Sequence, residues 1–290
     1  MELNSEIPAA APRDASTVVM LRDNPAHGLE VFLLRRHGLS DVLGGAYVFP
    51  GGKLDASDAE LDAQRHLDQS AEHLHGALGE PELPIAKAQG LFVAALREAF
   101  EESGVLFTTT PRSSNEKREL AHQSPFNQML SMHALQLQTS ALVPWSRWIT
   151  PRMPSITNKR FDTRFFVAAV PTDQEASHDN HEATESVWVQ PRHALEQYWD
   201  GRIELAPPQI MSLAHLARHA TVNDVLEAAR SQRPPLVFPE TFDENGARVL
   251  CYPGDPQHSV TTRALPGPTR LLYRKGRFEP VDGFEALFAD

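Results

Sequence analysis

The segment from residue 90 to residue 104 constrains this chain most, because the two faces of one helix require two different environments. At about 100° per residue, apolar side chains gather on one face: Phe92, Val93, Leu96, Ala99 and Phe100. Three carboxylates gather on the opposite face, with the spacing i, i+3 and i+4: Glu98, Glu101 and Glu102. Gly104 is placed to provide a left-handed C-cap. The pattern predicts a helix over residues 90–103 that packs on a core and presents three carboxylates on its other side.

These glutamates lack the partners that a solvated acidic face would have. The residues four positions after them are Glu102, Val105 and Leu106, none of them basic. Glu102 and its neighbour Glu101 also lie in the last turn, where the helix dipole disfavours a carboxylate by about 0.3–1 kcal/mol. Arg97 precedes Glu101 by four residues, which is the weaker orientation for an ion pair. A hard divalent cation such as Mg²⁺, which prefers oxygen ligands, accounts for the cluster more simply.

A glycine turn upstream completes a recognisable pattern. The paired glycines of residues 49–52 (F-P-G-G) let the backbone approach a metal or a phosphate closely. Together with residues 97–105 (R-E-A-F-E-E-S-G-V) they resemble the signature of the Nudix hydrolases, G-x5-E-x7-R-E-U-x-E-E-x-G-U. The second half matches at every specified position. The first half departs from it, because 36 residues rather than five separate Gly52 from the slot of the first glutamate, an insertion of 31, and that slot holds Gln89.

Further blocks resemble the Nudix branch that contains the peroxisomal coenzyme A diphosphatases. They lie at residues 148–151 (W-I-T-P), 160–166 (R-F-D-T-R-F-F) and 207–209 (P-P-Q). The coenzyme A signature itself matches only in part, because Asp41 stands where an arginine is expected. The resemblance therefore identifies the family more firmly than the substrate.

The resemblance implies a Nudix-like α/β/α sandwich, an α/β (α+β) fold with a mixed β-sheet. It implies Mg²⁺ or Mn²⁺ bound by the carboxylates of Glu98, Glu101 and Glu102 and by the carbonyl of Gly51. Arg97 would orient the glutamates. A further carboxylate, as base or extra ligand, would come from Glu182 or Glu185; the mobility of its loop slightly favours Glu182, although a solvated loop acid fits the spacing equally well.

The implied reaction is hydrolysis of a diphosphate bond in a nucleoside diphosphate linked to another group. Coenzyme A or an acyl-CoA is the first expected substrate, and ADP-ribose or NADH is the alternative. A non-catalytic ligand sensor is the rival from another class, and the intact glutamate trio argues against it. Four arginines are candidates for binding substrate phosphates: Arg35, Arg36, Arg160 and Arg164. For Arg160 and Arg164 a pairing with structural acids is an equally open alternative.

Three weaker features have ordinary explanations. His215 and His219 have a zinc-like i, i+4 spacing, but no glutamate follows the first histidine, which favours a surface or packing role. Trp145 and Trp148 could stack on a nucleobase, although buried tryptophans are more often part of a core. Cys251, the single cysteine, has no local activating group and fits a reducing compartment.

The remaining pattern predicts a single domain over residues 17–290, after a disordered tail at residues 1–16. Residues 53–88, helical in character over 58–74, form an insertion that we expect to shape one wall of the substrate cleft, and a C-terminal extension runs from about residue 202. Predicted strands cover residues 17–23, 29–36, 46–52, 161–171 and 186–191. One predicted helix begins at Pro125, with Ser124 as its N-cap, and its apolar stripe extends to Leu137; another helix covers 191–201, and two more fill 208–230. A hairpin turn is predicted at 275–276. The net charge of −11 argues against nucleic acid, and no apolar run spans a membrane, so the cytoplasm is expected. The oligomeric state is left open.

Overall fold

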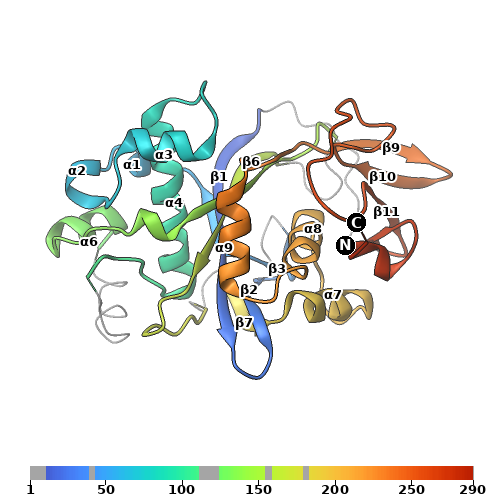
Figure 1. The fold of residues 1–290 in the computed structure, drawn as a ribbon, viewed down its shortest axis with the longest axis horizontal. Coiled ribbons are helices and arrows are strands. Elements are labelled where there is room, and N and C mark those ends of the chain that lie inside the picture. Colours follow the sequence, from blue (N-terminus) through green and yellow to red (C-terminus); the bar gives the residue numbers. More distant parts are fainter. Residues whose placement is uncertain (1–10, 39–42, 111–123, 154–158, 179–182, 290) are drawn as a thin grey trace.

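A mixed β-sheet runs through the centre of the molecule and carries helices on both faces (Figure 1). The computed structural model describes residues 11–38, 43–110, 124–153, 159–178 and 183–289. The main sheet has the order β3-β2-β1-β6-β5-β8, with β4 paired to β1 and β7 paired to β2; its strands are β1 (Arg13–Asn24), β2 (Gly28–Arg36), β3 (Tyr47–Val48), β4 (Gly51–Lys53), β5 (Val143–Ile149), β6 (Phe161–Ala169), β7 (Ala183–Val189) and β8 (Leu236–Val237). β1 and β6 are parallel, whereas β1 and β2 are antiparallel.

Two groups of helices cover the two faces of this sheet. The first group is α1 (Ala56–Ala59), α2 (Ala63–His66), α3 (Ala71–Leu78), α4 (Ile85–Ser103) and α6 (Phe126–Met132); the second is α7 (Pro191–Trp199), α8 (Pro207–Leu216) and α9 (Val222–Ser231). Alternate residues of β1 supply the two cores, Val18 and Met20 on the α4 side, Val19 and Leu21 on the α8 side. The expected α/β/α sandwich is therefore confirmed. Within the described ranges, no helix has the length and apolarity needed to cross a membrane.

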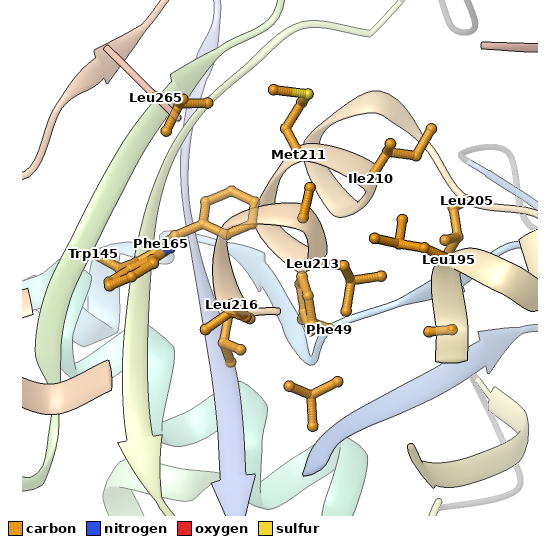
Figure 2. Packing of buried hydrophobic residues seen from close by; sticks show 14 of the residues in the cluster. Phe49, Trp145, Phe165, Leu195, Leu205, Ile210, Met211, Leu213, Leu216 and Leu265 are labelled. Atoms are coloured by element: carbon orange, nitrogen blue, oxygen red, sulfur yellow. The ribbon is translucent and has the colours of Figure 1, made fainter. Parts of the chain in front are cut away.

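The core on the α8 side continues into a second, smaller sheet. Figure 2 shows Phe49 and Phe165 of the central sheet region packed against Leu213 of α8. The second sheet has the order β12-β11-β10-β9, formed by β9 (Glu240–Glu244), β10 (Ala247–Cys251), β11 (Arg270–Arg274) and β12 (Arg277–Pro280). Two short 3₁₀ helices, η1 (Thr139–Ala141) and η2 (Phe284–Leu287), complete the structure. The turn at residues 275–276 has positive φ at both positions, which confirms the predicted hairpin.

Several elements begin earlier than the sequence predicts, β1 and α4 by the largest margin. β1 begins at Arg13, inside the expected tail, because Arg13 to Leu21 pair in register with β6. Helix α4 begins at Ile85 rather than at residue 90. Gly90 does not end this helix; it gives room for a neighbour, since a Cβ there would lie 2.9 Å from the Cα of Ala59 in α1.

The insertion folds as three short helices rather than as one. Asp62 caps α2 and Ser70 caps α3, so the chain changes direction between them. Helix α6 begins at residue 126 with Pro125 as its N-cap, one position later than predicted. Leu137 does not continue the apolar stripe of α6, since it lies beyond that helix and bridges to Leu67 of the insertion.

A buried ion network ties the insertion to the sheet. Three acids and three bases form it: Asp14, Glu80, Asp162, Lys87, Arg147 and Arg164. Glu80, from the loop after α3, bonds to Arg147 at 2.7 Å and to Arg164 at 2.6 Å. Because the charges balance, the network can stay buried without a counter-ion.

We expect Glu80→Gln to destabilise the fold, because it leaves two arginines with one carboxylate fewer at a partly buried site. The free energy of unfolding should fall by about 3 kcal/mol, measured by urea denaturation. Glu82→Gln, at an exposed position of the same loop, is the control and should unfold like the parent. Equal stability of both variants would contradict a stabilising role for this network.

Candidate active site

 The glycine turn and the acidic helix α4 meet directly, although 44 residues, 53–96, separate Gly52 from Arg97. Pairing of β4 with β1 sets Gly51 opposite Thr17, and the Gly51 N–H donates to Glu102 Oε2 at 2.9 Å. A Cβ on Gly52 would overlap the carboxylate of Glu98. The two halves of the split signature therefore come together at one place.

Arg97 connects this site to the insertion and uses every N–H of its guanidinium group to do so. Nε and Nη2 donate to the two carboxylate oxygens of Asp58, both at 2.9 Å, and Nη2 also donates to the main-chain oxygen of Lys53 at 3.0 Å. Nη1 donates to Glu98 Oε1 at 2.7 Å and to Glu101 Oε2 at 3.0 Å. All five donors of the group are thus satisfied by oxygen atoms.

Arg97 and the acids around it shift one another's pKa values. Burial by itself lowers the pKa of Arg97, but the Asp58 hydrogen bond and the nearby acids outweigh it and hold the pKa above its ordinary value. Burial raises the pKa of the Glu101 carboxyl, Arg97 opposes that rise, and Asp58 adds to it. Four carboxylates thus lie at this site: those of Asp58, Glu98 and Glu101 contact Arg97, and that of Glu102 accepts from the Gly51 N–H.

The carboxylates of Glu98, Glu101 and Glu102 are ligands of the kind that a hard divalent cation prefers, although in this structure they accept hydrogen bonds from N–H groups of the protein. In the part of the chain that the structure describes, no three His, Cys, Asp or Glu side chains are grouped as a metal site. Arg97 draws Glu98 and Glu101 to one side, and Gly51 N–H holds Glu102. Several carboxylate oxygens beside a glycine peptide are the kind of oxygen ligands that Mg²⁺ or Mn²⁺ prefers.

The four candidate arginines do not share one environment. The side chain of Arg164 is only 3% exposed and bonds to Glu80 and Asp14, so it serves the buried ion network rather than a substrate. Arg160 donates to the main-chain oxygen of Thr150. Arg36 is half-buried, and its main-chain N–H donates to the main-chain oxygen of Ala46. Arg35 is half-exposed, and its Nη1 lies 3.5 Å from Glu185 Oε2.

The two candidate loop acids have different outcomes. Glu182 lies outside the described residues. Glu185 lies on the α7 side of the sheet, where it contacts Arg35 and Tyr47. Burial and the Glu185 hydrogen bond raise the pKa of Tyr47 to about 12. Glu185 is therefore engaged away from the glutamates of α4.

The weaker features take structural roles. Trp145 is buried and its ring lies 4.3 Å from that of His215, while Trp148 packs on Phe165 in the core. Burial lowers the pKa of His215 to about 4, so this histidine is a neutral packing residue at neutral pH. Burial raises the pKa of Cys251 to about 11, which leaves its thiol protonated.

One residue of the site escaped the reasoning from sequence. Asp58 lies in the insertion, where an acid near a helix start is read as a capping residue, and it does occupy position N3 of α1. Its side chain is fully buried against Arg97. The only available signal was its place six residues after Gly52, close to the interrupted signature.

Comparisons with known proteins agree with this geometry. Residues 7–216 match the family model described as the NUDT19 Nudix domain. The chain is 28% identical to an acyl-coenzyme A diphosphatase NUDT19 of Xenopus laevis and 30% identical to that of Homo sapiens, in both cases over 70% of this chain and 64% of the relative. The chain thus spans slightly less than two thirds of the length of these relatives.

A solved structure supports the same assignment. The crystal structure of a Nudix hydrolase from Alicyclobacillus acidocaldarius is 27% identical, with a TM-score of 0.61, and the match covers 78% of this chain and 98% of that one. The family model covers well over half of the chain, including the glycine turn and all of α4. This chain belongs to the Nudix family, in the group of the NUDT19 Nudix domain.

Proposed function

We propose that this protein hydrolyses the diphosphate bond of a nucleoside diphosphate linked to another group, with Mg²⁺ or Mn²⁺ as cofactor. The observation that carries the proposal is the meeting of Glu98 and Glu102 with the Gly51-Gly52 peptide across a long insertion. Folding alone gives no reason to gather three carboxylates on Arg97 and to bring that of Glu102 to the Gly51 N–H. Binding of a cation and a diphosphate gives such a reason.

Each part of the site has a role in this reaction. A bound divalent cation would stabilise charge on the phosphoryl oxygens and acidify the attacking water. Glu98, Glu101 and Glu102 would hold it, with the Gly51 carbonyl as a further ligand. Arg97 fixes the carboxylates of Glu98 and Glu101 through Nη1. Glu182 remains our candidate for the base or extra ligand.

Coenzyme A or an acyl-CoA is the substrate that we favour. The curated relatives carry the name acyl-coenzyme A diphosphatase, which supports this choice. Of the four candidate arginines, Arg35 combines exposure with a loose ion pair, since its side chain is 50% exposed and its distance to Glu185 is 3.5 Å. Arg35 lies beside Glu185, away from the glutamates of α4, and the 3′-phosphate of coenzyme A is on the ribose, away from the diphosphate. Arg35 is therefore our candidate partner for that phosphate.

ADP-ribose or NADH remains the alternative substrate, and a ligand sensor without hydrolysis remains the alternative function. A screen of diphosphate compounds with Mg²⁺, in which the products are identified, separates the three. A cytoplasmic location and the absence of a nucleic-acid partner belong to the same proposal, on the single cysteine and the net charge of −11.

We expect Glu102→Gln to remove most of the activity and to weaken metal binding while the fold stays intact, because glutamine is also a good helix former. A loss of about 3 kcal/mol of transition-state stabilisation would lower kcat roughly 100-fold. Glu72→Gln, at an exposed position of α3, is the matched control. Chelation with EDTA should stop the parent and added Mg²⁺ should restore it; a Glu102→Gln variant that turns over like the parent would exclude this metal site.

The two glycines should respond differently to alanine. Gly52→Ala pushes on the flexible end of Glu98, so activity should fall by roughly 100-fold with little change in thermal stability. Gly51→Ala meets the backbone of Ser16 and Thr17, so it should destabilise the fold by about 1–3 kcal/mol. Calorimetry and steady-state kinetics on both variants test this; full activity of Gly52→Ala would contradict the placement of Glu98.

The substrate is tested by comparing coenzyme A with 3′-dephospho-coenzyme A. A charge-assisted contact is worth about 1.5–3 kcal/mol, so Arg35→Ala should lower kcat/KM for coenzyme A roughly 10–150-fold and leave the dephospho compound unaffected. Arg202→Ala, at another exposed arginine, serves as control. Equal rates on the two compounds in the parent would remove the coenzyme A assignment and favour the dinucleotide.

A further inference from the structure

The position where the Nudix signature has its first glutamate carries no charge in this chain. Gln89 occupies it, and its side chain is buried. Its amide Nε2 donates to the main-chain oxygen of Leu61 at 2.6 Å, so it anchors the insertion to α4. Position 89 of α4 therefore supplies no carboxylate to the site.

Asp58 of the insertion does supply a carboxylate. Its side chain is fully buried, and its two oxygens accept from Nε and Nη2 of Arg97. Asp58 Oδ2 also accepts from the N–H of Asp55, which fixes the rotamer of the side chain. The carboxylate of Asp55 lies farther from Arg97, at 3.8 Å, and is 64% exposed.

The packing of α1 on α4 holds Asp58 in place. Ala59, the next residue, lies so close to Gly90 that a Cβ on this glycine would be 2.9 Å from the Ala59 Cα. The main-chain oxygen of Lys53, at the start of the insertion, accepts a further Arg97 N–H at 3.0 Å. Three of the five N–H groups of Arg97 thus bond to residues 53–58, and the other two bond to Glu98 and Glu101.

We propose that Asp58 is a positioning residue, by which the insertion supplies a buried carboxylate that fixes Arg97 for the metal-binding carboxylates. This inference rests on the proposed function. Asp58 acts only through Arg97: with Nε and Nη2 held, Nη1 is left to face Glu98 and Glu101. Loss of Asp58 frees the guanidinium group to rotate and to displace both carboxylates.

The first experiment replaces Asp58 by asparagine, which has nearly the same shape but offers an NH₂ group to an arginine donor. Partners of metal ligands typically contribute 10–100-fold to metal affinity or activity, so kcat and Mn²⁺ affinity should each fall by roughly that factor while KM stays near that of the parent. Mn²⁺ binding is read from the EPR signal of the free ion. Asp62→Asn is the matched control, because Asp62 caps α2 and asparagine caps a helix equally well.

The second experiment is a double-mutant cycle between Asp58→Asn and Arg97→Gln. If Asp58 acts through Arg97, the double variant should have the kcat of Arg97→Gln alone; losses that multiply would overturn the proposal. The double variant also guards against misfolding. Arg97→Gln leaves a buried carboxylate unpaired, and removal of that charge should restore thermal stability.

The outcomes separate this inference from the proposed function. A parent that hydrolyses diphosphates, with an Asp58→Asn variant that matches it in kcat and Mn²⁺ affinity, overturns only the role of Asp58. A parent that binds Mn²⁺ but hydrolyses no diphosphate overturns the proposed function, while Mn²⁺ binding by Asp58→Asn still decides the role of Asp58. A parent that binds no Mn²⁺ overturns both.

Discussion

The site depends on the hydrogen bonds of the Arg97 guanidinium group. It joins the insertion to α4 through Asp58 and Lys53, and it holds the carboxylate of Glu98, which lies against Gly52 of the glycine turn. Because all five N–H groups have oxygen partners, a shift of any of these parts costs hydrogen bonds at a buried charge. A chain with a long insertion inside its signature can therefore keep the glycine turn and the glutamates together.

Two clusters of charged side chains lie near β1, one around Arg164 and one around Arg97, and their carboxylates have different partners. The network around Arg164 has three acids and three bases, so its charges balance without an added ion. At the cluster around Arg97, three carboxylates contact one guanidinium group, and Glu102 accepts from the Gly51 N–H. The first cluster joins parts of the fold, whereas the second gathers the oxygen ligands for the cation that we propose. The meeting of these carboxylates with the glycine turn, more than the presence of glutamates, marks the site that we propose for the chemistry.

Sequence patterns with a strong local cause predicted most of the fold. The α4 helix, the hairpin at residues 275–276 and the strands of the sheet follow from periodicity and turn residues. Features that depend on partners far along the chain were missed or misjudged. Asp58 looks like a cap until α1 packs on α4, and Arg164 looks like a phosphate ligand until Glu80 folds onto it. β5 was not predicted, because its sequence V-P-W-S-R-W-I contains a proline and does not alternate regularly between apolar and polar residues.

The central claim is that a divalent cation binds where Glu98 and Glu102 meet the Gly51-Gly52 peptide. Anomalous diffraction from crystals soaked in Mn²⁺, recorded at the manganese edge, tests it most directly. We predict a peak within coordination distance of Glu98, Glu102 and the Gly51 carbonyl, about 2.0–2.2 Å for hard oxygen ligands of a small divalent ion. A strong peak elsewhere, with no density at these three residues, would contradict the account.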